Sequence, residues 1–109
     1  MTEPIVTDVP EREQYEIVVD GVRAGLAAYL DIGDGGGQRV FHHTEIDKTF
    51  GGRGLGSTLI AAALDDTRSA GKRIVPTCSF VEAYVAKHPE YADVVDPVTP
   101  QVRAALENL

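Results

Sequence analysis

Alternating apolar and polar positions near the start of the chain predict two β-strands joined by a tight turn. Tyr15, Ile17 and Val19 recur at every second position, which is the period of a half-buried strand. Asp20 and Gly21 follow directly, and this dipeptide favours a two-residue hairpin turn. The apolar pattern then resumes over residues 22–30. We therefore expect an antiparallel hairpin in this part of the chain.

The middle of the chain predicts a third strand, a glycine-rich loop and a helix. Residues 31–37 contain many glycines and aspartates, and residues 38–46 contain many β-branched and aromatic side chains, so a turn and a third antiparallel strand are expected. Glycines interrupt the pattern again at residues 51–56. From Ser57 to residue 70, apolar residues recur at helical spacing, at Leu59, Ile60, Ala63 and Leu64.

The last third of the chain predicts a short buried strand and two further helices. Residues 73–76 form a brief apolar run that is typical of a buried strand. Ser79 and Glu82 have the spacing of a capping box, so we expect Ser79 to cap a helix that ends before Pro89. Residues 99–109 begin with Thr-Pro, which favours the start of a terminal helix.

Length and composition indicate one globular domain. A chain of 109 residues, 43% hydrophobic and 25% charged, has the size and composition of a single core. We expect the domain to span residues 14–109 and to follow a loose polar arm at residues 1–13, which carries two prolines and several charges. No stretch approaches the length of a membrane span, so no membrane partner is expected.

Charge and cysteine content indicate which partners and which cellular compartment to expect. Ten Lys and Arg residues against seventeen Asp and Glu residues give a formal charge of −7, which repels nucleic acids, so no nucleic-acid partner is expected. The one cysteine, Cys78, cannot form an intrachain disulfide. A lone thiol is typical of a reducing compartment, and we expect a cytoplasmic protein. The oligomeric state is left open.

The glycine loop has the composition of a phosphate-binding loop. In FGGRGLGSTLI, at residues 50–60, glycines let backbone N–H groups face a phosphate, and the dipole of the following helix adds to the attraction. The Walker pattern does not fit, because no lysine precedes Ser57. The dinucleotide pattern does not fit either, because Leu59 stands where its third glycine would be. An ordinary flexible turn is the alternative.

Three segments in one order resemble the GNAT superfamily of N-acetyltransferases, and in particular its small YjdJ-like subgroup. They are HTEI at residues 43–46, the glycine loop, and PTCSFVEAYVAKHPEY at residues 76–91. The coenzyme A loop of this superfamily is written Q/R-x-x-G-x-G/A, and Gly54 and Gly56 match its last two fixed places. Gly51 occupies the Q/R place, and Arg53 is near enough to supply a cation instead.

The resemblance implies a fold, a cosubstrate and a binding site. The fold would be α/β, of the α+β kind, with a mostly antiparallel central sheet and flanking helices in a minimal version. Acetyl-CoA would be the cosubstrate and no metal would be needed. Pantetheine would insert between the strand ending at Ile46 and the strand ending near Thr77. The implied coenzyme A contacts are His43, Thr44, Glu45, Ile46, Gly51, Gly52, Arg53, Gly54, Leu55, Gly56, Ser57 and Cys78.

Four residues are candidates for catalysis, each with a structural alternative. Tyr84 resembles the tyrosine that protonates the departing thiolate in the superfamily, and it could equally be a core aromatic. Glu45 and His43 share a strand face and could deprotonate an amine, or could simply be solvated or hydrogen-bonded across strands. Cys78 could accept the acyl group, line the thioester site, or be buried structure.

The sequence therefore predicts direct transfer of an acetyl group from acetyl-CoA to an amine that it does not identify, with Cys78 lining the site. A non-catalytic acyl-CoA sensor or interaction module is the alternative. Such a protein would keep the glycine loop and would need neither a base nor an acid.

Overall fold

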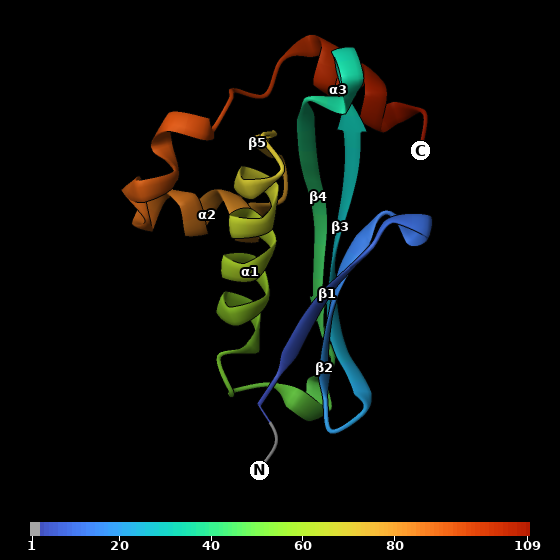
Figure 1. Cartoon of the computed structure of the whole chain (residues 1–109), viewed down its shortest axis with the longest axis vertical. Helices are drawn as coiled ribbons and strands as arrows, with labels where there is room; N and C mark the ends of the chain where they lie inside the picture. Colours follow the sequence, from blue (N-terminus) through green and yellow to red (C-terminus); the bar gives the residue numbers. More distant parts are fainter. Residues whose placement is uncertain (1–2) are drawn as a thin grey trace.

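The computed structural model describes residues 3–109 and contains one five-stranded sheet flanked by three helices (Figure 1). The strands lie in the sheet in the order in which they occur along the chain. They are β1 (Ile5–Val9), β2 (Gln14–Val19), β3 (Val22–Ile32), β4 (Gln38–Ile46) and β5 (Arg73–Pro76). The helices are α1 (Leu55–Ser69), α2 (Ser79–Lys87) and α3 (Pro100–Glu107), and four short 3-10 helices occupy loops.

The first strand corrects an expectation. Residues 1–13 were expected to form a loose arm, but β1 pairs antiparallel with β2 from Ile5↔Val18 to Val9↔Gln14. Val6 packs against the main core, and the Tyr29 hydroxyl donates to Asp8 at 2.6 Å. Residues 5–9 are therefore part of the sheet, and residues 1–2 lie outside the described part of the chain.

The predicted hairpin is confirmed at its turn. Asp20 and Gly21 have φ values of 50° and 79°, and two consecutive positive φ values are what a tight hairpin turn requires. The strands on either side, β2 and β3, pair antiparallel. The pairing continues from β3 to β4, so the first four strands form an antiparallel meander.

The fifth strand breaks the antiparallel pattern. β4 and β5 pair in parallel, and α1 forms the crossover between them. The register runs from Gln38↔Arg73 to Phe41↔Pro76 and stops there, although β4 continues to Ile46. On its other side, β4 pairs with β3 through a bulge at His42, because Ala28 lies opposite His43 and Tyr29 lies opposite Phe41.

Helices cover both faces of the sheet. α1 and α2 pack on one face, over a core that includes Tyr15, Ile17, Tyr29 and Phe41. α3 packs on the other face, where Val102 joins Val40 and Val75 in a second, smaller core (Figure 1). Alternation along the strands sends side chains to both cores, which is why β4 contributes Val40 to one and Phe41 to the other.

The helix bounds differ a little from the expected ones. α1 begins at Leu55, two residues before the expected start, and Gly54 is its N-cap. α2 has Cys78 at its N-cap position, without a side-chain capping bond, so the expectation that Ser79 caps this helix was wrong. α3 begins as expected, with Thr99 as its N-cap. The Thr99 hydroxyl accepts from the Val102 N–H at 3.2 Å.

A buried cation joins three strands. Arg39 on β4 is 6% exposed and forms two hydrogen bonds to the Asp31 carboxylate, at 2.7 and 2.9 Å. It also donates to the Tyr15 hydroxyl at 2.6 Å, and its guanidinium lies 4.0 Å from the centre of the Tyr29 ring. Although burial alone would lower the pKa of Arg39, the bond to Asp31 and nearby tyrosines raise it, so this cation stays charged.

Candidate functional site

The glycine loop presents backbone rather than side chains. Gly52 and Gly54 have φ values of 79° and 71°, a region that other residues adopt only with strain. A Cβ at either position would meet nothing within 4 Å, so the space beside this backbone is open. The loop therefore combines a conformation that favours glycine with room for a ligand.

The first turn of α1 points amide groups into that space. The N–H groups of residues 55–57 have no acceptor within the helix, since the first intrahelical bond here runs from the Thr58 N–H to the Gly54 carbonyl at 3.2 Å. The first turn of α1 carries no acidic residue that would oppose an anion. Arg53 lies beside the turn, with its guanidinium 5.4 Å from the centre of the Phe50 ring. This arrangement suits a phosphate.

The ends of β4 and β5 meet at Phe41. Its carbonyl accepts from the Thr77 N–H at 3.0 Å, the Cys78 N–H at 3.1 Å and the Thr77 hydroxyl at 2.9 Å. Beyond this point β4 continues, while the chain after β5 turns into α2. Among residues 3–109, no strand pairs with the outer edge of β4 after Phe41. The glycine loop and Cys78 thus follow the carboxyl ends of the two parallel strands, where α/β sheets usually bind ligands.

Two predicted site residues touch each other across this gap. The Thr44 hydroxyl and the Cys78 Sγ lie 3.3 Å apart, and both side chains are partly buried. Cys78 is a free thiol that packs against the main core. Thr44 and Ile46 face the α1 side of the sheet, since Ile46 also packs against that core.

His43 and Glu45 face the opposite side. Their side chains are 55% and 62% exposed, and His43 Nε2 lies 3.5 Å from Glu45 Oε1. The expectation that they share a strand face is confirmed. Because of the alternation along β4, their side chains point away from Cys78, so only their backbone groups adjoin the gap on the Cys78 side.

A groove of about 250 Å³ separates the start of α1 from α2. It is lined by Ser57, Phe80, Ala83, Tyr84, Lys87 and His88. The Phe80 ring packs over Gly56, where an added Cβ would lie only 2.7 Å from the ring carbon Cζ. Phe80 and Lys87 were not among the predicted site residues, since only the packing of the two helices brings them to the loop.

Tyr84 is half-buried and lies in this groove. It packs partly against the main core, and its ring stacks on His88 with 4.0 Å between centroids. Burial raises the pKa of Tyr84, and the nearby charges of Glu90 and Asp65 raise it further. The hydroxyl therefore keeps its proton and can act as an acid rather than a base.

The structure thus gathers most of the predicted coenzyme A contacts in one region. The loop residues Gly51, Gly52, Arg53, Gly54, Leu55, Gly56 and Ser57 join the end of β4 to the start of α1, and Thr44 and Cys78 lie together at the gap. Among residues 3–109, no helix is long and apolar enough to cross a membrane, and no cluster of potential metal ligands is present.

A mostly antiparallel sheet with one parallel pair, and a glycine loop leading from that pair into a helix, agree with the fold that the resemblance to N-acetyltransferases implied. Comparison with protein families agrees, because the model for the GCN5-related N-acetyl-transferase family matches residues 14–94, more than half of the chain. The chain belongs to this family. The GNAT fold and superfamily predicted from the sequence are therefore confirmed, while the YjdJ-like subgroup stays a prediction.

A solved structure shows the same fold. The solution structure of a GCN5-like putative N-acetyltransferase from Staphylococcus aureus superposes with a TM-score of 0.66 at 20% sequence identity. The match covers 92% of this chain and 95% of the other. A search of curated proteins found no match. At this identity the likeness concerns the fold alone, so the roles of the individual site residues stay predictions.

Proposed function

We propose that this chain binds acetyl-CoA and transfers the acetyl group directly to an amine. The observation that carries the proposal is the placement of the glycine loop and Cys78 at the ends of the only parallel strand pair among the described residues. Membership of the N-acetyltransferase family supports it. The cosubstrate would supply an activated acetyl thioester.

Each part of the site would then have one task. The N–H groups at the start of α1, with Arg53, hold the phosphates. The unpaired edge of β4 after Phe41 offers backbone groups to the pantetheine arm and to the acyl carbonyl. Cys78 and Thr44 form the wall beside the sulfur.

Transfer requires two proton movements. The amine nitrogen forms a bond to the acyl carbon and gives up a proton, which Glu45 accepts directly or through water with His43 beside it. The bond from carbon to sulfur breaks, and Tyr84 donates its hydroxyl proton to the departing thiolate. Tyr84 then regains a proton from solvent and Glu45 releases one, so that atoms and charges balance.

A non-catalytic acyl-CoA sensor is the second candidate. The exposed placement of His43 and Glu45, on the face away from Cys78, favours it, because a sensor needs no base near the thioester. Gly51 also lacks the side chain that relatives have at the Q/R place of the loop.

Mass spectrometry of gently purified protein, under conditions that keep complexes intact, tests the ligand. We expect a bound coenzyme A species, and added acetyl-CoA that never associates would contradict both candidates. Incubation with acetyl-CoA and a panel of amines then separates them. Acetylated amine in excess over free-thiol release without an amine supports the transferase, whereas binding without any turnover supports the sensor.

A further inference from the structure

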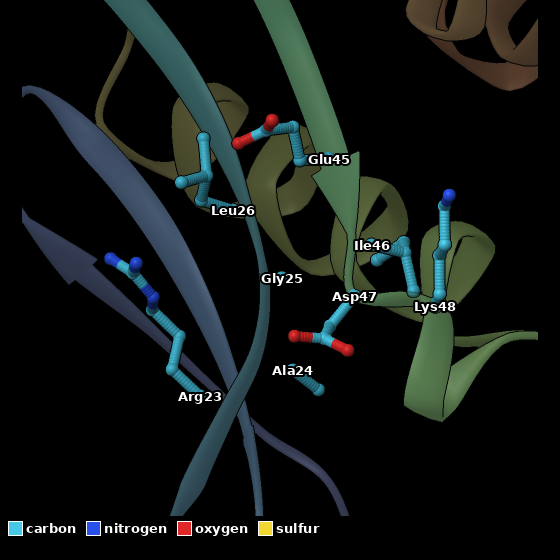
Figure 2. Close-up of a pocket in the computed structure, with 8 residues that line it drawn as sticks. All are labelled: Arg23, Ala24, Gly25, Leu26, Glu45, Ile46, Asp47 and Lys48. Carbon is cyan, nitrogen blue, oxygen red and sulfur yellow. The ribbon is translucent and has the colours of Figure 1, made fainter.

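A second groove opens on the exposed side of β3 and β4 (Figure 2). Its volume is about 460 Å³, and it is lined by Arg23, Ala24, Gly25, Leu26, Glu45, Ile46, Asp47 and Lys48. Of these residues, only Glu45 and Ile46 were expected to take part in the function. The groove therefore extends the candidate site to residues of β3 and to the loop after β4.

The backbone of Gly25 forms part of the floor of this groove, and the space that a Gly25 side chain would take on the core side holds the Ile46 side chain. Gly25 pairs with Ile46, and an added Cβ would lie 2.5 Å from the Glu45 carbonyl oxygen and 2.6 Å from Ile46 Cδ1. The two strands approach so closely that only glycine fits. The Asp47 N–H donates to the Ala24 carbonyl at 2.7 Å, and this bond fixes the backbone next to Gly25 and Ile46.

Charges of both signs surround the floor. Figure 2 shows the Glu45 carboxylate reaching toward Leu26 and the Asp47 carboxylate extending toward Ala24, while Arg23 and Lys48 flank the groove on opposite sides. Asp47 Oδ1 accepts one bond, from the Thr49 N–H at 2.9 Å, which leaves its other oxygen for a ligand. Arg23 lies 3.4 Å from Glu16 Oε2, in a pair that is half exposed on the arginine side.

The groove adjoins the proposed transfer centre. Glu45 follows Thr44, whose hydroxyl lies 3.3 Å from Cys78 Sγ on the other face of β4. Because β4 has no partner strand on its outer edge after Phe41 among the described residues, a ligand in the groove can reach across that edge. One strand segment therefore separates the acyl side from the groove side.

We propose that this groove binds the acceptor, and that the acceptor is a small zwitterion with a primary amine and a carboxylate, such as a free amino acid. This inference rests on the proposed transferase function. The ammonium group would lie between Glu45 and Asp47 and would lose one proton to solvent to become the neutral amine that attacks, and the carboxylate would face Lys48. Two carboxylates and a cation beside them match such a ligand, whereas a simple amine leaves Lys48 without a counter-charge, since Arg23 is already paired with Glu16.

Transfer rates within matched sets of acceptors test the charge requirement. Each amino acid is compared with its own amide and with its decarboxylated amine, at one concentration of acetyl-CoA. We expect kcat/KM for the amino acid to exceed both others by about tenfold or more, since a hydrogen bond to a charged group contributes that much. Equal or better use of the amides, the amines or a short peptide would overturn the zwitterion.

A pair of variants localises the effect. Lys48→Gln should reduce the preference for the amino acid over its amide several-fold, because the carboxylate loses a cation. Arg103→Gln removes the same charge from α3, outside the groove, and should leave the preference unchanged. Equal effects of both variants would show that overall charge, and not the groove, sets the preference.

Chemical shifts of backbone amides separate this proposal from the proposed function. An amino acid added to the protein with coenzyme A should move the resonances of Gly25 and Asp47. Transfer to amines without these shifts overturns the groove and keeps the transferase. Shifts without any transfer support the groove as a binding site and overturn the transferase, and neither shifts nor transfer overturns both.

Discussion

Gly54 and Gly71 have similar φ values and lie at opposite ends of α1. Their φ values are 71° and 74°, and a Cβ at either position would meet nothing within 4 Å. Gly54 starts α1 within the glycine loop, whereas Gly71 follows its far end. The pair therefore separates backbone strain from ligand contact.

Replacing Gly54 with valine should abolish the binding of acetyl-CoA. The side chain would strain the backbone by about 1–2 kcal/mol and would occupy the space proposed for phosphate. Gly71→Val should cause a similar loss of stability and leave affinity unchanged. Calorimetric titration of both folded variants measures this, and unchanged affinity in Gly54→Val would rule out the loop as the phosphate site.

Tyr84→Phe should slow transfer without weakening the binding of coenzyme A. The ring and its stacking on His88 remain, and only the acid is lost, so kcat should fall by about 10²-fold or more. Because the pKa of Tyr84 is raised, wild-type kcat should stay high until the pH exceeds about 10, the ordinary value for tyrosine. Full activity in the variant would show that Tyr84 contributes to packing and not to catalysis.

Cys78 should form a mixed disulfide with coenzyme A under oxidising conditions. Thiol exchange needs the two sulfurs to come together, and Cys78 is partly buried beside Thr44 at the proposed thioester site. Peptide mapping by mass spectrometry locates the adduct. If no adduct forms and a thiol reagent reacts only after unfolding, the thioester lies elsewhere.

The kinetics of a Cys78→Ala variant separate the two functional roles of this residue. Direct transfer predicts that the variant keeps substantial activity, since the thiol only lines the site. An obligatory acyl-enzyme predicts nearly complete loss, together with ping-pong kinetics in the wild-type protein.

Arg39 shows how the elements of the sheet are joined. Replacing it with glutamine removes the bidentate bond to Asp31 and the contacts with Tyr15 and Tyr29. We expect the free energy of unfolding to fall by about 2–3 kcal/mol, less than for a fully buried pair because Asp31 is 31% exposed. Denaturant titration measures this change.

Arg12→Gln provides the matched control. Arg12 pairs with Glu16, but its side chain is 62% exposed, so the substitution should cost less than about 1 kcal/mol. Equal losses in the two variants would show that Arg39 contributes no more than a surface charge.

The elements that the sequence predicted well carry local signals. Strand β4 and strand β5 occupy the expected residues, and the turn at Asp20 and Gly21 is where the dipeptide placed it. Strand β1 was missed because its five residues stand between Pro4 and Pro10 and gain order by pairing with β2. That pairing is a tertiary contact, and no local pattern reports it.

The candidate site divides in the same way. The loop at residues 51–56 and Cys78 could be found from a motif, since glycines and a distinctive segment mark them in the sequence. Phe80 over Gly56 and the floor at Gly25 could not, because each depends on two segments meeting in space. The exposure of His43 and Glu45 could not be predicted either. It depends on which parts of the sheet α1 and α3 cover, and the alternation along the strand does not show this.

At the scale of the whole molecule, the chain adds each strand beside the previous one, and α1 provides the only crossover within the sheet formed by residues 3–109. The single change from antiparallel to parallel pairing therefore falls between β4 and β5. Both segments of the proposed site lie at this junction.

The early end of the β4 and β5 pairing has a consequence for hydrogen exchange. Amides of residues 42–46 that point away from β3 have no partner strand among the described residues, so they should exchange with solvent far faster than those of residues 38–41. Saturating coenzyme A should slow them if pantetheine takes the place of the missing strand, while amides of β1 serve as the reference. Exchange followed residue by residue would then report the ligand as an increase in protection along one half of one strand.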